Sequence, residues 1–341
     1  MITLKGQTNV TQLRSGLNAA EKLGKELGKF VVTTMEIPWK VTQSKLGGDP
    51  EAVIMVETME ESWLDRMVSM LPACNTVVGI GGGQAIDAAK YISWKKGVRL
   101  VSIPTILSVD AFVTPAIGIR RNHEVFYVGE STPDPLVIDF EILRTAPPEL
   151  NVAGIGDLLS AHTGTYDWEY AQEKGRSEFP FSQADIVAAR NILAKLDPLL
   201  PDIRKNNDRG LMAIVEGYMT INTICLPAGH YRVEEGSEHY LFYELEERLQ
   251  RPFVHGYIVG LGIYLMSQLQ KNRFEWIREV MDRVGLKYHP GDLRISKDDL
   301  TESMLNLKNY VNEKPNLWYT VIDDSKITKE WAQTSMAGLK F

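Results

Sequence analysis

Three short runs in the second half of the chain place a carboxylate or an imidazole beside glycine, where helical patterns begin. They are Gly154-Ile155-Gly156-Asp157, Gly236-Ser237-Glu238-His239 and His255-Gly256. Carboxylate and imidazole groups bind divalent metals such as zinc and iron, and a catalytic metal keeps one coordination position open for substrate. Each residue also fits a structural role, because Asp157 suits a helix N-cap and a lone histidine is often a hydrogen-bonded core residue. The spacing alone leaves both interpretations open.

A second candidate site is a glycine turn between an apolar run and a helical pattern. Residues 77–80 have the composition of a buried strand, residues 81–83 are all glycine, and helical spacing begins at Gln84. A helix N-terminus points unpaired N–H groups and the positive end of its dipole outward. The turn therefore favours a phosphate or pyrophosphate site over a turn that binds nothing. It is not the usual Gly-x-Gly-x-x-Gly motif, so it does not name a ligand by itself.

Two kinds of structure must position these residues. In the first half, apolar runs and helical patterns alternate, which predicts a parallel, doubly wound α/β sheet. Residues 117–120 and 125–128 flank a polar segment and predict a β-hairpin. The sequence predicts helices over 10–27, 60–71 and 84–96, and strands over 30–34, 52–56, 77–80, 98–103 and 136–139.

The pattern changes after Pro147-Pro148, where helical spacing takes over and no further strand is expected. We therefore predict an α/β domain over residues 1–147 and an all-α domain over residues 148–341. The active site is expected in the cleft between these two domains.

Composition restricts the class of protein. The chain has 341 residues, of which 44% are hydrophobic and 24% charged, as in ordinary soluble proteins. Its net charge of −7 argues against nucleic acid as the main partner. Cys74 and Cys225 give no disulfide framework, and no apolar run approaches the roughly 18 residues of a membrane span. We expect a cytoplasmic protein that binds neither nucleic acid nor membrane.

Taken together, the motifs occur in the order found in one superfamily. The chain resembles the iron-containing alcohol dehydrogenase and dehydroquinate synthase-like superfamily, and within it most closely the glycerol-1-phosphate dehydrogenase branch. The resemblance spans about residues 30–262. It rests on the runs 81–90 and 102–110 and on the Asp157, His239 and His255 sites, with the closer likeness carried by residues 156–160, 167–168 and 236–239.

The resemblance implies a Rossmann-like domain that binds NAD or NADP and a helical domain that holds one divalent metal. Zinc is expected first, with iron and nickel as alternatives. Asp157, His239 and His255 match the metal ligands, and Asp110 matches a catalytic position near the nicotinamide and substrate. The dinucleotide turn and a cofactor-facing loop match Gly81, Gly82, Gly83, Asp87, Thr105 and Ser108.

The end of the first predicted strand departs from the family pattern. Many relatives carry an aspartate near Thr34 or Met35, where it holds the adenosine ribose. Its absence removes an acceptor for the 2′-hydroxyl and a repulsive charge against a 2′-phosphate. We therefore treat Thr34 and Met35 as cofactor contacts and expect both NAD and NADP to be used.

The resemblance implies a dehydrogenase that oxidises or reduces a secondary alcohol of a polyol, glycerol phosphate or sugar phosphate. The alternative is a dehydroquinate synthase-like cyclase or lyase that uses NAD catalytically on a sugar phosphate. That chemistry calls for a glutamate as the first metal ligand, so Asp157 favours the dehydrogenase. The retained ligand set weighs against a third alternative, a catalytically silent relative. We expect a small-molecule substrate and a homo-oligomer, dimeric or larger.

Overall fold

The computed structural model describes residues 9–122 and 124–341, which form two compact units. Of the described residues, the sheet unit contains 9–122, 124–151 and 206–230. The helical unit contains residues 152–205 and 231–341. The division at residue 148, like the cleft between domains, stays a prediction. One helix of the second half, α10 (Asp208–Ala228), groups with the sheet unit rather than with the other helices.

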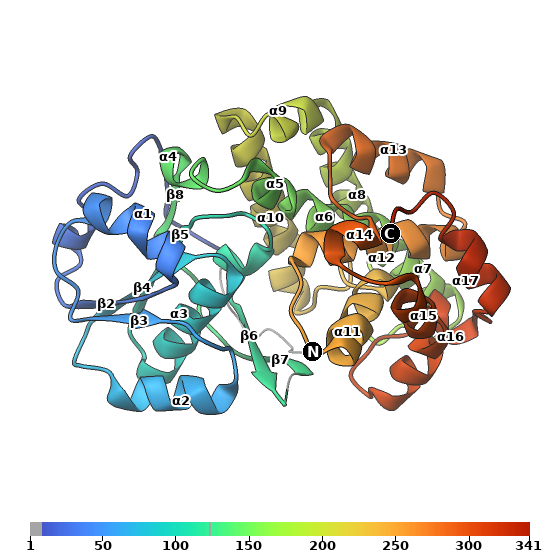
Figure 1. Cartoon of the computed structure of the whole chain (residues 1–341), viewed down its shortest axis with the longest axis horizontal. Coiled ribbons are helices and arrows are strands. Elements are labelled where there is room, and N and C mark those ends of the chain that lie inside the picture. The colour runs from blue at the N-terminus through green and yellow to red at the C-terminus, as the bar shows by residue number, and fades with distance from the viewer. Residues whose placement is uncertain (1–8, 123) are drawn as a thin grey trace. The chain divides into compact units, whose positions relative to one another are not determined.

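A parallel sheet of six strands forms the centre of the sheet unit, in the order β1-β8-β5-β4-β2-β3 (Figure 1). All its neighbouring strands pair in parallel, which confirms the predicted α/β fold class. The strands are β1 (Leu13–Gly16), β2 (Phe30–Thr34), β3 (Ala52–Met55), β4 (Thr76–Gly81), β5 (Arg99–Pro104) and β8 (Leu136–Asp139). The predicted hairpin is also present, as β6 (Ala116–Arg121) and β7 (Glu124–Glu130).

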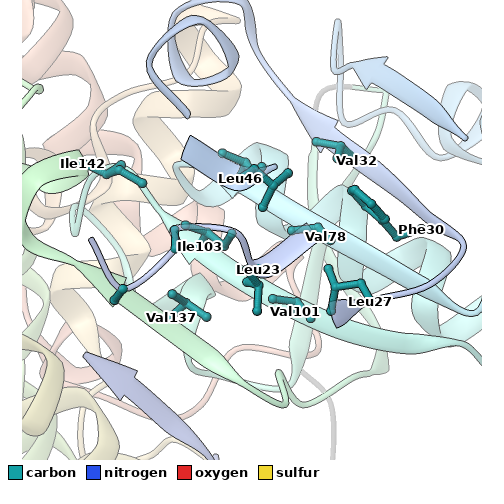
Figure 2. Packing of buried hydrophobic residues seen from close by; sticks show 13 residues of the cluster. Leu23, Leu27, Phe30, Val32, Leu46, Val78, Val101, Ile103, Val137 and Ile142 are labelled. Carbon is teal, nitrogen blue, oxygen red and sulfur yellow. The ribbon is translucent and has the colours of Figure 1, made fainter. Parts of the chain in front are cut away.

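Successive side chains of the central strands point to opposite faces of the sheet, as strand geometry requires. Val78 and Val101 belong to the cluster drawn in Figure 2, whereas their neighbours Val77 and Leu100 pack in another cluster. That second cluster includes Ile92 of α3 (Gly83–Lys96). Because both faces are covered, the strands read as continuous apolar runs in the sequence.

Helices of the sheet unit follow the predicted pattern in part. α2 (Glu61–Met70) and α3 match the helices expected over 60–71 and 84–96. α1 (Glu36–Leu46) was not predicted. The remaining short helical segments of this part of the chain are η1 (Leu23–Glu26), η2 (Asp110–Phe112), α4 (Phe140–Leu143) and α5 (Pro148–Val152).

The prediction of a helix over residues 10–27 is wrong. Residues 13–16 form β1, which pairs with β8 in the register Leu13↔Leu136, and only the short η1 follows. Asn18 and Lys22 adopt φ values of 56° and 61°, which a right-handed helix does not contain. The backbone bonds gained at the sheet edge therefore outweigh the helical spacing of the apolar residues.

The helical unit consists of helices and connecting segments, and its described residues contain no strand, as predicted (Figure 1). Its longer helices are α7 (Ala161–Glu173), α8 (Gln183–Leu196), α11 (Ser237–Leu249), α12 (His255–Gln270), α13 (Phe274–Val284) and α15 (Lys297–Glu313). The shorter ones are α6 (Gly154–Leu159), η3 (Asp197–Leu199), α9 (Leu200–Arg204), α14 (Pro290–Leu293), α16 (Val321–Asp324) and α17 (Lys329–Ser335).

Helix α10 is long and apolar enough to cross a membrane by length and composition alone. Core helices of soluble proteins share these properties, and 56% of its most apolar window is buried in the structure. The side chain of Asn222 on this helix donates a hydrogen bond to the backbone oxygen of Val113, 3.2 Å away in the same unit. These contacts are those of a packed core helix.

Candidate metal centre

Asp157, His239 and His255 converge within the helical unit. Asp157 lies on α6, His239 in the first turn of α11, and His255 is the first residue of α12. Their ligand atoms all lie within 4.8 Å of one another. The Oδ1 atom of Asp157 is 3.0 Å from Nε2 of His255 and 3.4 Å from Nε2 of His239. Three residues far apart in the sequence thus direct donor atoms at one point.

Glycines beside the three residues allow their helices to approach closely. A Cβ atom on Gly156 would lie 2.0 Å from the backbone oxygen of Gly256, and one on Gly256 would lie 1.7 Å from that of Ala153. A Cβ atom on Gly262 of α12 would lie 2.4 Å from the backbone oxygen of Glu238. No other residue type fits these positions, so the glycines bring α6 and α11 against α12 and set the distances between the three side chains.

The donor set fits a divalent metal. Nδ1 of His239 lies 2.9 Å from Oε1 of Glu238 and can donate only to this carboxylate oxygen. A neutral imidazole carries one proton, so Nε2 of His239 then presents a lone pair. That lone pair faces the anionic oxygen of Asp157, and the two repel unless a cation lies between them. Metal–ligand bonds of about 2.0–2.2 Å would place an ion among atoms this close together.

The electrostatics of the site also favour a positive charge. Burial disfavours the charged form of Asp157, yet the imidazoles of His255 and His239 hold its pKa well below the usual range. Burial likewise disfavours protonated His239, but Asp157 and Glu238 raise its pKa well above the usual range. Both pKa shifts have the same cause, because the buried carboxylates of Asp157 and Glu238 attract a cation. When no metal is bound, that cation is the proton on His239.

The glycine turn lies at the carboxyl end of β4 in the sheet unit. Gly82 is the N-cap of α3 and has no side chain that could accept a hydrogen bond. The first N–H groups of that helix therefore receive no side-chain cap. Gly81 has φ +150°, which favours glycine, and a Cβ atom on Gly82 would lie 2.8 Å from Cδ1 of Ile106. A Cβ atom on Gly83 would lie 2.8 Å from Cγ1 of Val109. The loop that follows β5 therefore packs on the turn and accounts for its lack of side chains.

Other predicted cofactor contacts lie at the same edge of the sheet. Because β2 and β5 both neighbour β4, the ends of these parallel strands meet beside the turn. Thr34 ends β2 fully buried, and Met35 follows it with 40% of its surface exposed. The N–H group of Thr105 donates to the backbone oxygen of Gly81 at 2.9 Å. Ser108 is buried in the same loop, and Asp110 begins η2.

Asp87 has a different environment from the other predicted cofactor residues. Its Oδ1 atom lies 2.8 Å from Nζ of Lys90, whose side chain is fully buried and also donates to the backbone oxygen of Ala116 at 2.7 Å. Burial raises the pKa of Asp87, although the charge of Lys90 and the N–H group of Gly118 oppose this shift. The pair ties α3 to β6, and a contact between Asp87 and a cofactor stays a prediction.

Sequence reasoning assigned no role to Glu238, although it lies in a run that was singled out. The structure places its carboxylate against the ring of His239. In the sequence, the feature that could have identified Glu238 is its position directly before a candidate histidine ligand. That signal is weak, because adjacent residues on a helix do not normally face each other.

Comparison with known proteins relates the chain to one group of dehydrogenases. A family model described as iron-containing alcohol dehydrogenase matches residues 32–147. A glycerol-1-phosphate dehydrogenase [NAD(P)+] of Methanosphaera stadtmanae is 26% identical over 82% of this chain and 79% of its own length. The protein with the same description from Sulfurisphaera tokodaii is 29% identical over 90% of this chain and 87% of its own length.

Solved structures show the same fold. A probable glycerol dehydrogenase from Sinorhizobium meliloti matches with a TM-score of 0.75 at 20% identity, covering 98% of this chain and 97% of its own. Glycerol dehydrogenase from Schizosaccharomyces pombe matches with a TM-score of 0.72 at 18% identity, covering 99% of this chain and 91% of its own. The fold therefore extends over nearly the whole chain.

Proposed function

Because the chain belongs to the iron-containing alcohol dehydrogenase superfamily, we propose that it is a metal-dependent, NAD(P)-linked dehydrogenase of a polyol or polyol phosphate. The observation that carries this proposal is the convergence of Asp157, His239 and His255 within 4.8 Å. Relatives that match most of the chain act on glycerol 1-phosphate by name, and structural neighbours act on glycerol. We propose that the reacting group is a secondary alcohol of such a substrate.

We propose that Asp157, His239 and His255 hold one divalent ion. Nitrogen and carboxylate ligands suit zinc best, with iron and nickel as alternatives. When bound, such an ion would act as a Lewis acid on the substrate hydroxyl. The two imidazoles contribute Nε2 lone pairs, and Asp157 contributes a negative charge. Three protein ligands would leave the ion accessible to substrate, and Asp110 is proposed to lie near the nicotinamide.

We propose that the N–H groups at the start of α3 bind the pyrophosphate of NAD or NADP. Gly82, the N-cap of α3, offers these groups no side-chain cap bond. Thr105, Ser108 and Asp87 are proposed to support the same cofactor, and Thr34 and Met35 to lie beside its adenosine ribose. The cofactor carries the hydride, while these residues hold and align it.

The Gly82→Val variant is expected to bind NAD⁺ weakly, because its branched side chain would occupy the turn and displace Ile106. The readout is the dissociation constant measured by calorimetry, alongside helix content from circular dichroism. Met70→Val is the control, since it places the same branched side chain on α2 of the same unit at a position that is 72% exposed. Unchanged affinity in the Gly82 variant would remove the turn from the cofactor site.

A panel of substrates tests the proposed reaction. The purified protein is supplied with NAD⁺ or NADP⁺ and with glycerol, longer polyols, glycerol 1-phosphate or sugar phosphates. Net formation of reduced nicotinamide is expected with at least one of them. Release of inorganic phosphate without net NAD(P)H would instead support the cyclase or lyase alternative, in which the cofactor is reduced and reoxidised within one turnover.

We further propose that the protein works in the cytoplasm as a homo-oligomer, dimeric or larger. Its relatives are metabolic enzymes with small-molecule substrates by name, which supports the small-molecule assignment. The presence of only two cysteines suits a reducing compartment. The net charge of −7 disfavours nucleic acid as a partner.

A further inference from the structure

Glu238 is a fully buried carboxylate in direct contact with one candidate metal ligand. Its Oε1 atom accepts from Nδ1 of His239 at 2.9 Å and from the N–H group of Gly236 at 2.7 Å. The side chain has no exposed surface, and its Oε2 atom has no hydrogen-bond partner among the described residues. Burying a carboxylate is costly unless something compensates its charge, and the first turn of a helix offsets only part of this cost.

A rigid frame holds Glu238 in this position. Asp167, buried on α7, accepts from the N–H group of Ser237 at 2.8 Å through Oδ2 and from that of Val321 at 3.0 Å through Oδ1. A Cβ atom on Gly236 would lie 2.7 Å from Oδ2 of Asp167 and 3.2 Å from Oε2 of Glu238. Only glycine therefore allows both carboxylates to pack at the start of α11.

Arg232 strengthens the same frame. Its side chain has no exposed surface, and its guanidinium donates to the backbone oxygens of Asp167, at 3.1 Å, and of Tyr319. These bonds hold the segment before α11 in place against α7 and the backbone at Tyr319. The runs 167–168 and 236–239, which marked the resemblance in the sequence, thus meet in one structure that fixes the backbone of Glu238 and His239.

We propose that Glu238 is a positioning residue of the metal centre, whose carboxylate fixes the tautomer of His239 that presents Nε2 to the ion. With Nδ1–H committed to Glu238, the ring cannot turn that nitrogen towards Asp157. The buried negative charge also increases the basicity of the ring, which strengthens its bond to a cation. Asp157 and Glu238 together balance the charge of one divalent ion. The inference rests on the proposed metal-dependent function.

Two substitutions separate the charge of Glu238 from its geometry. Glu238→Gln keeps an oxygen that can accept from His239 and Gly236 but removes the charge. Glu238→Ala removes both and frees the imidazole to adopt the other tautomer. Loss of such a hydrogen-bonding partner of a ligand lowers metal affinity by about 10–100-fold in other proteins, so we expect about 10-fold for the glutamine variant and about 100-fold for the alanine variant.

The experiment measures Zn²⁺ affinity of metal-free protein by competition with a chromophoric chelator, and the visible absorption of the Co²⁺-loaded protein. Glu244→Gln is the matched control, because this glutamate is buried on the same helix and pairs with Arg248. We expect the control to match the wild type, and both Glu238 variants to bind Zn²⁺ more weakly with altered Co²⁺ bands. Because Glu238→Gln keeps the bond to Gly236, its unfolding temperature without metal should stay near that of the wild type.

Wild-type affinity in the Glu238→Gln and Glu238→Ala variants would overturn the inference, as would an equal loss in Glu244→Gln. If Glu238→Ala fails to fold, the Zn²⁺ affinity of the Glu238→Gln variant alone tests the inference. A wild-type protein that binds no Zn²⁺ and no Co²⁺ would overturn the proposed function itself. Binding by the wild type with no effect at Glu238 would overturn only this inference.

Discussion

Replacing His255 by alanine should remove most of the bound metal and most of the activity while both units stay folded. The imidazole supplies one of three protein ligands, so the loss should exceed the roughly 10–100-fold effect of changing a partner of a ligand. The side chain of His255 is 17% exposed and packs edge-on against Phe242, but it makes no side-chain cap bond to α12, so we expect the helix to persist without it. Elemental analysis, NAD(P)H formation and circular dichroism measure the three effects.

His289→Ala is the matched control for His255→Ala. His289 is the N-cap of α14 in the same unit and makes no side-chain cap bond there. This variant should keep its metal and its activity. Full metal content in the His255 variant, or a loss of helix as large as its loss of metal, would contradict the assignment of His255 as a ligand.

Met35→Asp should shift the choice of cofactor towards NAD. Met35 follows β2, whose neighbour β4 carries the glycine turn, so its side chain is proposed to lie by the adenosine ribose. An aspartate there would accept from the ribose hydroxyls and repel a 2′-phosphate. The expected change is about 1–3 kcal/mol in the ratio of kcat/KM for NAD to that for NADP, a factor of about 5–150.

Met35→Asn separates charge from helix capping in this experiment. Met35 is the N-cap of α1 and makes no side-chain cap bond, so either asparagine or aspartate would stabilise that helix. Only aspartate repels the phosphate, and the asparagine variant should shift the ratio far less. Strong rejection of NADP by the wild type, or an unchanged ratio in Met35→Asp, would show that the end of β2 lies elsewhere relative to the ribose.

Strong local patterns predicted most strands of the parallel sheet and the helices α2 and α3. The buried strands β2, β4 and β5 are continuous apolar runs, and α3 ends at Lys96 as expected. The pattern failed over residues 10–27, where pairing with β8 at the sheet edge decides the backbone conformation. The 21-residue α10 has a helical pattern like the helices around it, so the sequence did not show that it packs in the sheet unit.

The candidate metal site could be predicted only through a family resemblance. Up to 98 positions separate its residues, and no spacing rule brings Asp157 to His255 across three helices. The glycines beside them had suggested helix starts, whereas the structure shows that Gly156 and Gly256 permit close helix contact. Glu238 stayed unassigned because its role depends on the backbone at Gly236, which the frame around Asp167 determines.

Titration of metal-free protein with Zn²⁺ or Fe²⁺ tests the metal-dependent dehydrogenase most directly. Formation of NAD(P)H from glycerol 1-phosphate and from unphosphorylated polyols is followed as the ion is added, for the wild type and for His255→Ala. We predict that wild-type activity rises with added metal and stops rising at one ion per chain, and that His255→Ala stays inactive. Full activity of the metal-free protein, or equal activation of His255→Ala, would contradict the account.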